Sequence, residues 1–155
     1  MSSPKFCWDS SVFIALLTAE PRSEEDVAGL SEVIDLVDRR EVTVITSSLI
    51  RSEVLDDATD PDLRRRLEDL FRRPSCVMVD VNRAISDKAG SLRSACRESG
   101  RRLRTPDAVF IATALLHRVD ALHSFDDDHL SLSRRPEVDG LLICKPHGTQ
   151  TILSL

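Results

Sequence analysis

The sequence predicts an α/β protein, a three-layer α/β/α sandwich around a central, mostly parallel sheet of five strands. Two observations predict this class. Short apolar segments rich in β-branched residues alternate with longer segments of helical periodicity, and no repeat or low-complexity tract interrupts them. Strands that alternate with helices form a parallel sheet that helices cover on both faces. The length of 155 residues is typical of one domain, so we expect a single domain over 1–155.

The first half of the chain is expected to contain three strands and four helices. The strands are predicted at 5–8, 42–46 and 76–79, and the helices at 10–18, 23–38, 47–58 and 61–71. The first helix is apolar on nearly every side, which predicts deep packing. Ser23 can cap the second helix, and the acidic residues after it suit the positive end of the helix dipole. Pro61 stands in the first turn of the fourth helix, where proline is favoured.

The second half is expected to contain two helices and two strands, with a short helical turn between the strands. The helices are predicted at 82–100 and 105–117, and the strands at 121–124 and 141–144. Ile85, Ala89 and Leu92 share one face of the first of these helices, and Gly100 is a typical stop signal. The second helix is apolar around most of its girth, so we expect it to be deeply packed.

The composition is that of a globular protein, with 41% hydrophobic and 30% charged residues. The longest apolar run, 12–17, is far shorter than the ~20 residues of a membrane span. The N-terminus carries no recognisable signal peptide, so we expect a cytoplasmic protein that makes no membrane contact. The four cysteines are widely spaced, which predicts small buried thiols in a reducing compartment rather than a zinc site.

Four carboxylates are predicted to meet at one edge of the sheet. Asp9 directly follows the first strand, and Asp126 directly follows the fourth. Glu53 lies early in the helix after the second strand, and Asp107 lies in the first turn of the helix at 105–117. Open parallel sheets bind ligands beyond the carboxyl ends of their strands, where crossover helices also begin. Taken one at a time, each acid could instead cap a helix or lie in solvent.

Grouped carboxylates need a compensating positive charge, because like charges held close together cannot all stay ionised. Mg²⁺ supplies that charge and prefers oxygen ligands. Two such ions would balance four carboxylates and could clamp the attacking and leaving oxygens of a phosphoryl displacement. The chain itself carries a net charge of −5, so any nucleic-acid role needs positive charge from elsewhere. The acids therefore predict a divalent-metal site that handles an anionic polymer.

The segments around these acids resemble the acidic motifs of PIN domains, and most closely those of the toxin ribonucleases of bacterial VapBC toxin–antitoxin pairs. The similar segments are DSSVFIALL at 9–17, SLIRSEVL at 48–55, TPDAVFIATA at 105–114 and HSFDDDHL at 123–130. The resemblance implies an endoribonuclease that depends on Mg²⁺ or Mn²⁺, with one or two ions, and hydrolyses RNA phosphodiesters with a metal-activated water. It also implies the toxin of a type II toxin–antitoxin pair, with a cognate antitoxin and usually a homodimer.

The resemblance carries roles over to individual residues. The metal-binding, catalytic acids would be Asp9, Glu53, Asp107 and Asp126, with Asp128 as a weaker, variable ligand. Ser11 and Ser124 fall where the family has small polar residues that support the site. His129 stands where an aromatic residue is frequent, a departure that bears on the packing of the loop.

Other polar and apolar groups suggest contacts outside the acids. Arg101, Arg102 and Arg104 immediately precede Asp107, so they could grip RNA phosphates beside the cleaved bond. The remaining arginine clusters are expected to be solvated, and the histidines lack ligand spacing and are expected at the surface or in packing. One face of the helix at 23–38 is expected to be partly core and partly a groove for an antitoxin segment; its residues are Val27, Leu30, Ile34 and Val37.

Three other functions stay open at this level. A receiver-like phosphoacceptor module could use the strand-end residues Asp9, Asp80, Ser124 and Lys145-Pro146. The pair of acids expected after its first strand is missing. A phosphatase resembling the haloacid dehalogenases would need a second acid two residues after Asp9, and that position holds Ser11. A PIN fold kept for binding alone is the third, and the intact acids argue against it.

Overall fold

The computed structural model describes residues 2–55 and 60–148. Its elements follow one another in the order β1 (Lys5–Trp8), α1 (Ser10–Thr18), α2 (Glu24–Asp38), β2 (Thr43–Ser47), α3 (Ile50–Val54), α4 (Pro61–Phe71), β3 (Cys76–Val79), α5 (Arg83–Glu98), α6 (Thr105–Leu116), β4 (Ala121–His123), α7 (Asp127–Leu130), a 3₁₀ turn (Pro136–Val138) and β5 (Ile143–Cys144). The predicted alternation of strands and helices is confirmed.

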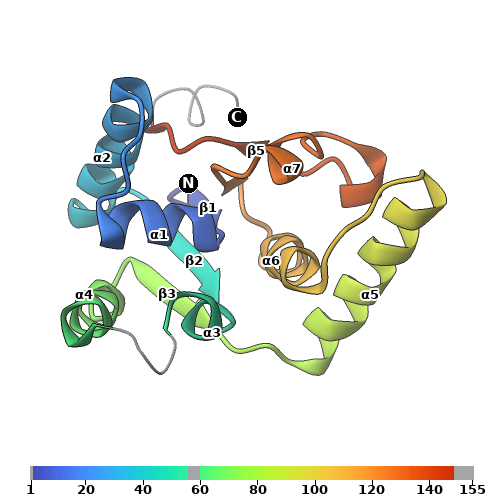
Figure 1. Cartoon of the computed structure of the whole chain (residues 1–155), viewed down its shortest axis with the longest axis horizontal. Helices are drawn as coiled ribbons and strands as arrows, with labels where there is room; N and C mark the ends of the chain where they lie inside the picture. The colour runs from blue at the N-terminus through green and yellow to red at the C-terminus, as the bar shows by residue number, and fades with distance from the viewer. Residues whose placement is uncertain (1, 56–59, 149–155) are drawn as a thin grey trace.

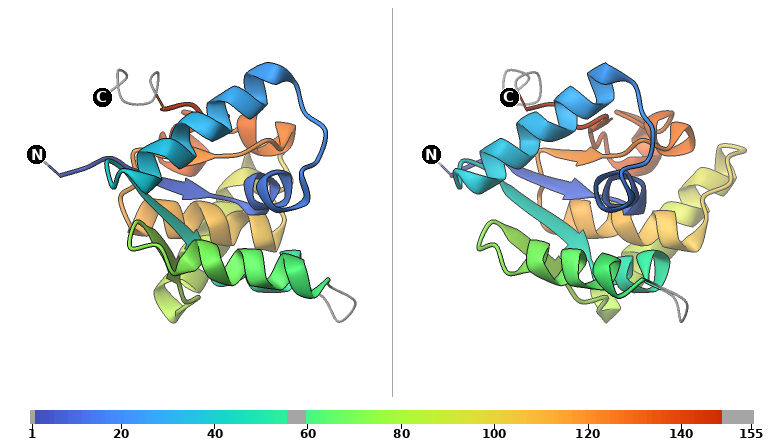
Figure 2. Two further views of the ribbon diagram at one scale, coloured as in Figure 1. Left: turned by 90° about the vertical axis from the view of Figure 1, so that its left-hand side faces the viewer. Right: turned by 60° about the vertical axis from the view of Figure 1, so that its left-hand side comes forward.

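The sheet has five strands in the order β3-β2-β1-β4-β5, and every neighbouring pair is parallel. It is therefore wholly parallel, where the sequence predicted a mostly parallel sheet. β1 lies at the centre, with Cys7 opposite Ile45 on one side and Leu122 on the other. Figure 2 shows β1 and β2 pointing toward the same edge, at which α1 begins. The strand order reverses between β1 and β4, so the carboxyl ends of these two strands mark the position at which open parallel sheets bind ligands.

The strand order argues against the receiver-like alternative. A receiver-type sheet has the order 2-1-3-4-5, which places its third strand beside the first. Here β3 is an edge strand, separated from β1 by β2. Asp80, which follows β3, is exposed at that edge. The residues that would have to act together in a receiver therefore do not meet.

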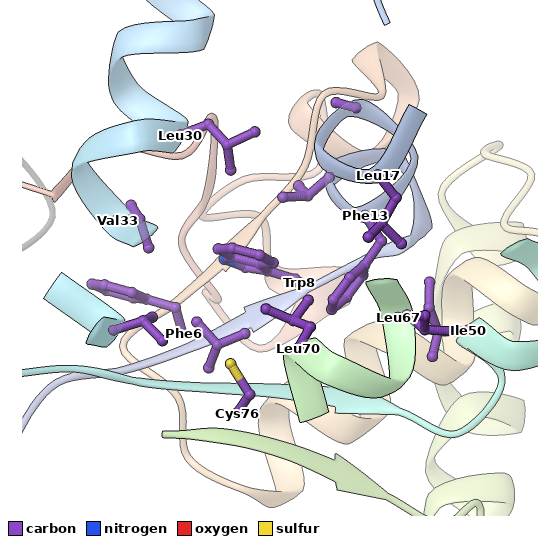
Figure 3. Close-up of a cluster of buried hydrophobic side chains, with 14 of the residues drawn as sticks. Phe6, Trp8, Phe13, Leu17, Leu30, Val33, Ile50, Leu67, Leu70 and Cys76 are labelled. Carbon is purple, nitrogen blue, oxygen red and sulfur yellow. The ribbon is translucent and has the colours of Figure 1, made fainter. Parts of the chain in front are cut away.

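Helices α1, α2 and α4 lie on one side of the sheet, and α5 and α6 lie on the other (Figure 1). The first side buries an aromatic core, in which the Trp8 ring meets Phe13 edge-on at 5.4 Å. Figure 3 shows Trp8 and Phe13 among the aliphatic side chains of α1, α2 and α4. The second side buries mainly aliphatic residues of α5 and α6. Burying a Phe side chain stabilises a fold by roughly 1.5–3 kcal/mol, so this core anchors the end of β1 and the residue that follows it.

The helix predicted at 47–58 is shorter than expected. Ser47 pairs with Val79 in the sheet, so it ends β2 instead of capping a helix. Its hydroxyl accepts a hydrogen bond from the backbone N–H of Leu49, and α3 begins only at Ile50. Leu55 is buried in an extended conformation, which ends α3 at Val54. The rest of the predicted helix, 56–58, lies outside the described residues.

Two further expectations concern the membrane and the cysteines. Among the helices of the described residues, none combines the length and apolar character needed to cross a bilayer. Cys7, Cys76 and Cys96 are buried, as predicted, whereas Cys144 in the edge strand β5 is only partly buried. Burial raises the pKa of the Cys76 thiol to about 11, so this side chain stays a neutral thiol at physiological pH.

Candidate active site

Asp9 is held at the end of β1 by hydrogen bonds from three directions. Its backbone N–H donates to the carbonyl of His123 at 3.3 Å, which continues the β1–β4 pairing by one residue. Its carboxylate Oδ1 caps α1 by accepting from the backbone N–H of Ser11 at 3.0 Å, and it also accepts from the Ser11 hydroxyl. The side chain is buried, with 2% of the residue exposed. Asp9 is therefore both a helix cap and a buried acid, so the two roles that the sequence suggested for it do not exclude each other.

Ser11 and Ser124 join the ends of β1 and β4. The Ser11 hydroxyl accepts from the backbone N–H of Phe125 at 2.9 Å, and the Ser124 hydroxyl accepts from that of Asp126 at 3.0 Å. The two hydroxyl oxygens lie 3.4 Å apart. Asp126 in turn caps α7 by accepting from the backbone N–H of Asp128 at 2.8 Å. This network sets the position of Asp126 relative to Asp9.

Asp107 reaches the same edge from the opposite side of the sheet. It lies in the first turn of α6, a helix that packs its buried residues against the sheet and begins at the sheet's carboxyl edge. Arg104, just before α6, donates from Nε to Oδ2 of Asp107 at 2.9 Å. A second guanidinium nitrogen lies 3.9 Å from Oδ2 of Asp126. One exposed cation thus links two acids that are distant in the sequence.

His129 stands between Asp9 and Asp107. Its Nδ1 lies 2.7 Å from Oδ2 of Asp9, and its Nε2 lies 3.2 Å from Oδ1 of Asp107. The expectation that this histidine is a surface or packing residue was wrong, because α7 turns its side chain inward and buries it against the two carboxylates. A signal was present in the sequence, since His129 lies one helical turn after Asp126 and therefore at the same edge as the acids.

The charges of this group depend on one another. Burial alone would lower the pKa of His129, but hydrogen bonds to Asp107 and Asp9 and their negative charges raise it to about 10. Burial alone would raise the pKa of Asp107, but His129 and Arg104 lower it on balance. At neutral pH His129 is therefore an imidazolium that both carboxylates stabilise. The site contains a buried internal cation that the sequence analysis had not foreseen.

Glu53 lies at the rim of this site and Asp128 lies outside the ion-paired group. Partial desolvation raises the pKa of Glu53, a hydrogen bond from Ser10 opposes that shift, and the negative charges of Asp107 and Asp9 reinforce it. Glu53 is thus close enough to feel both acids, although its own side chain is largely exposed. Asp128 is exposed, and among the described residues no ion pair joins its carboxylate to the other acids.

The chemistry of these side chains fits a divalent cation. In the described part of the chain, no three histidine, cysteine or acidic side chains are already arranged to hold a metal ion. The donors are nevertheless carboxylate oxygens, which Mg²⁺ and Mn²⁺ prefer. Positive groups, His129 and Arg104, already occupy the space between the acids. Because Arg104 is 64% exposed, it can leave Asp107 without disturbing the core, which would free oxygens for a metal.

Arg101 and Arg102 lie beside the acids in a hollow of about 380 Å³. Asp107 and His129 line the same hollow, so the predicted nearness of these arginines to the site is observed. Arg104 differs from the other two because it is paired with Asp107. All three arginines therefore line one hollow, but they differ in their pairing with the acids.

Comparison with known proteins finds two kinds of similarity. The sequence profile of the PIN domain matches residues 6–135. No curated protein sequence matches the chain.

Solved structures share the fold at low sequence identity. VapBC2 from Rickettsia felis, bound to a DNA fragment from its promoter, is 12% identical with a TM-score of 0.67, over 90% of this chain and 96% of that one. A toxin–antitoxin complex from Klebsiella pneumoniae is 18% identical with a TM-score of 0.61, over 94% and 98%. VapBC-5 from Mycobacterium tuberculosis is 23% identical with a TM-score of 0.57, over 91% and 98%.

Proposed function

This chain belongs to the PIN domain family, and from that premise we propose that it is a metal-dependent endoribonuclease acting as the toxin of a type II toxin–antitoxin pair. One observation carries the proposal: acids from four separate segments gather at the point where the strand order reverses. They are Asp9 after β1, Glu53 of α3, Asp107 of α6 and Asp126 after β4. Such a group suits the hydrolysis of an RNA phosphodiester.

In the proposed site, the acidic residues would bind the cation, and neighbouring polar residues would orient them. Asp9, Glu53, Asp107 and Asp126 would hold the cation, and Ser11 and Ser124 keep the ends of β1 and β4 in register. When bound, a divalent cation would supply positive charge to the phosphodiester and would lower the pKa of an attacking water. His129 fixes the orientation of Asp9 through Oδ2, while Ser11 fixes it through Oδ1.

The internal cations change the charge balance predicted from the sequence. Four carboxylates alone would need two Mg²⁺ for neutrality. With His129 protonated and Arg104 paired to Asp107, two of those negative charges are already offset. Since a bound metal would take the place of Arg104 at Asp107, the four acids suit one or two divalent cations. Titration of the metal-free protein with Mg²⁺ and with Mn²⁺ would distinguish the two ions.

An antitoxin would bind in the groove between α1 and α2. This groove has a volume of about 410 Å³ and is lined by apolar residues that include Leu16, Val27 and Ile34. Val27 is 52% exposed, whereas Leu30 and Val37 of the same helix are buried in the core. The predicted division of this helix face into core and groove is therefore found. Of the acids at the groove, Glu20 pairs with Arg22 and Asp26 pairs with Lys145, so the proposed occupant is a mainly apolar helix or strand.

The test is cleavage of RNA by the purified protein, alone and with Mg²⁺ or Mn²⁺. We expect cleavage with either ion, none after chelation, and none by Asp107→Asn in the presence of metal. Asp127→Asn is the matched control, because this exposed acid at the start of α7 makes no contact with the site acids. Equal cleavage by the wild type and Asp107→Asn would contradict the proposal. Copurification with a small DNA-binding partner, and a dimer in light scattering, would test the antitoxin and the expected homodimer.

A further inference from the structure

A surface of arginines without acidic partners adjoins the acids. Two hollows share Arg101, Arg102 and Leu103, so they are continuous. The first contains Asp107 and His129, and Asp128 also lines it. The second, of about 210 Å³, adds Arg93 and Arg97 from the last turns of α5. We call Arg93, Arg97, Arg101 and Arg102 the arginine track.

The track differs from the other arginines in its pairing. Many arginines of this acidic protein form ion pairs with carboxylates, among them Arg22, Arg51, Arg65, Arg72, Arg73, Arg104 and Arg135. Within the described residues, no track arginine forms an ion pair. Arg93 donates to the backbone carbonyl of Leu103 at 3.2 Å, and Arg101 donates to the hydroxyl of Ser131 at 3.3 Å. These guanidinium groups therefore keep their positive charge uncompensated by protein acids.

The arginine track is suited to an anion with regularly spaced negative charges. Guanidinium groups bind phosphates through paired hydrogen bonds, and several of them in a row match successive phosphates. Neither hollow is lined by Phe, Tyr or Trp, and the one imidazole in the first hollow, His129, is buried between Asp9 and Asp107, so the track itself offers no surface for stacking bases. A ligand held here would be recognised through its phosphates and not through its base sequence.

The position of the track assigns it a role at the same site. One end of the track lies in the hollow that holds Asp107, so a strand whose phosphate reaches the acids can continue over Arg101 and Arg102 toward Arg97. Because Asp9 is buried and Asp107 only partly exposed, a flexible single strand is needed to bring a phosphate close to them. We propose that the arginine track binds the backbone of single-stranded RNA on one side of the cleaved bond. This inference rests on the proposed nuclease function.

The test measures RNA binding in the absence of cleavage. Fluorescence anisotropy of a short labelled single-stranded RNA is followed in EDTA between about 50 and 200 mM salt. Each phosphate contact with a single strand adds about 0.7 to the slope of log affinity against log salt. The double variant Arg97→Ala, Arg102→Ala should therefore flatten that slope by about 1.4 and weaken binding most at low salt. Replacing both by lysine should restore most of the slope, because charge is the main requirement.

The matched control removes two other exposed arginines that form no ion pair with any described residue. Arg64→Ala with Arg118→Ala lowers the net charge by the same amount, and both positions lie outside the track. The proposal is overturned if the two double variants have equal salt slopes, or if the track variant keeps RNA binding and loses only the binding of a protein partner. Failure of the proposed nuclease function would give a different result. The wild type would then leave RNA intact in the presence of Mg²⁺ and Mn²⁺, whatever the salt slopes of RNA binding.

Discussion

Two buried histidines, one at the end of β4 and one in α7, lie in opposite chemical surroundings. His123 accepts a hydrogen bond from the indole N–H of Trp8 at 3.1 Å and packs on the ring of Phe6. His129 lies between the carboxylates of Asp9 and Asp107. Burial lowers the pKa of His123 to about 3, whereas the two carboxylates raise that of His129 to about 10. One ring is neutral and the other is charged across the physiological range.

The difference comes from the alternation of side chains at the end of β1. Consecutive residues of a strand point to opposite faces, so Trp8 enters the aromatic core while Asp9 faces the acids. The protonation state of each histidine matches its neighbour. His123 is neutral and accepts from an indole N–H, whereas His129 is charged and donates to a carboxylate. Burial alone therefore predicts neither the charge nor the role of a histidine. The partner that lies within hydrogen-bond distance decides both.

The largest expected effect follows from removing the negative charge beside His129. Asp9→Asn leaves the buried imidazolium with a neutral amide at Nδ1 and the Asp107 carboxylate at Nε2. Breaking a buried ion pair costs about 3–5 kcal/mol of unfolding free energy, and the remaining pair with Asp107 places the expected loss at the lower end of that range. Denaturant unfolding at neutral pH in EDTA measures it. Asp126→Asn is the control: this acid is 33% exposed, and asparagine caps a helix as well as aspartate does, so we expect a change below about 1 kcal/mol. Equal losses in the two variants would show that the buried pair contributes nothing of its own.

The second prediction concerns stability against pH in the metal-free protein. The folded pKa of His129 lies above its unfolded value, so its stabilisation is complete below about pH 6.5 and is lost as the pH rises toward about 10. The folded pKa of His123 lies below its unfolded value, so stability falls as the pH drops from about 6.5 toward about 3. Each group contributes a slope of up to about 1.4 kcal/mol per pH unit.

Single variants separate the two limbs of this pH profile. His129→Gln should remove the alkaline loss and keep the acidic one, and His123→Gln should do the reverse. Other charged groups facing these rings, Asp9, Asp107 and Arg104 near His129 and His147 near His123, are unchanged in both variants. Chemical denaturation from acid to alkaline pH provides the measurement. A wild-type profile that stays flat above neutral pH would contradict the charged state assigned to His129.

The smallest effect is expected at the exposed cation. Arg104→Gln removes a surface ion pair with Asp107, which is worth about 0.2–1 kcal/mol. The freed carboxylate should bind Mn²⁺ more tightly, by up to about fivefold, because no guanidinium competes for its oxygens. Isothermal titration calorimetry with Mn²⁺ measures the change, and Arg72→Gln, which breaks a more exposed pair of the same i,i+3 spacing with Asp69, is the control. Weaker Mn²⁺ binding by Arg104→Gln would mean that Arg104 supports the metal site.

Most of the fold was predictable because its signals are local. The β-branched run at β2, the caps Ser23 and Asn82 and the Pro at the start of α4 each act within a few residues. The prediction failed at α3, where the pairing of Ser47 with β3 overrode its tendency to cap a helix. Pairing between strands is a contact between distant segments, and a residue's own neighbours do not reveal it.

The acids of the site were predictable from local sequence patterns, whereas their ion-pair partners depend on packing between distant segments. Asp9 and Asp126 stand at strand ends, which local patterns locate, and parallel topology brings strand ends to one edge. The ion pairs of His129 depend on the direction in which the short helix α7 packs, and that direction is set by the serines that tie it to β1. The spacing of His129 from Asp126 places it at this edge of the sheet, but the spacing does not fix the direction of its side chain.

Local sequence patterns thus account for the alternating elements, the parallel sheet and the placement of acids at its carboxyl edge, since each follows from periodicity and turn chemistry. Long-range packing accounts for the protonation of His129, the pairing of Arg104 and the isolation of the arginine track. The physical reason is that charge states depend on distances of a few ångströms between segments, and only the folded chain sets those distances.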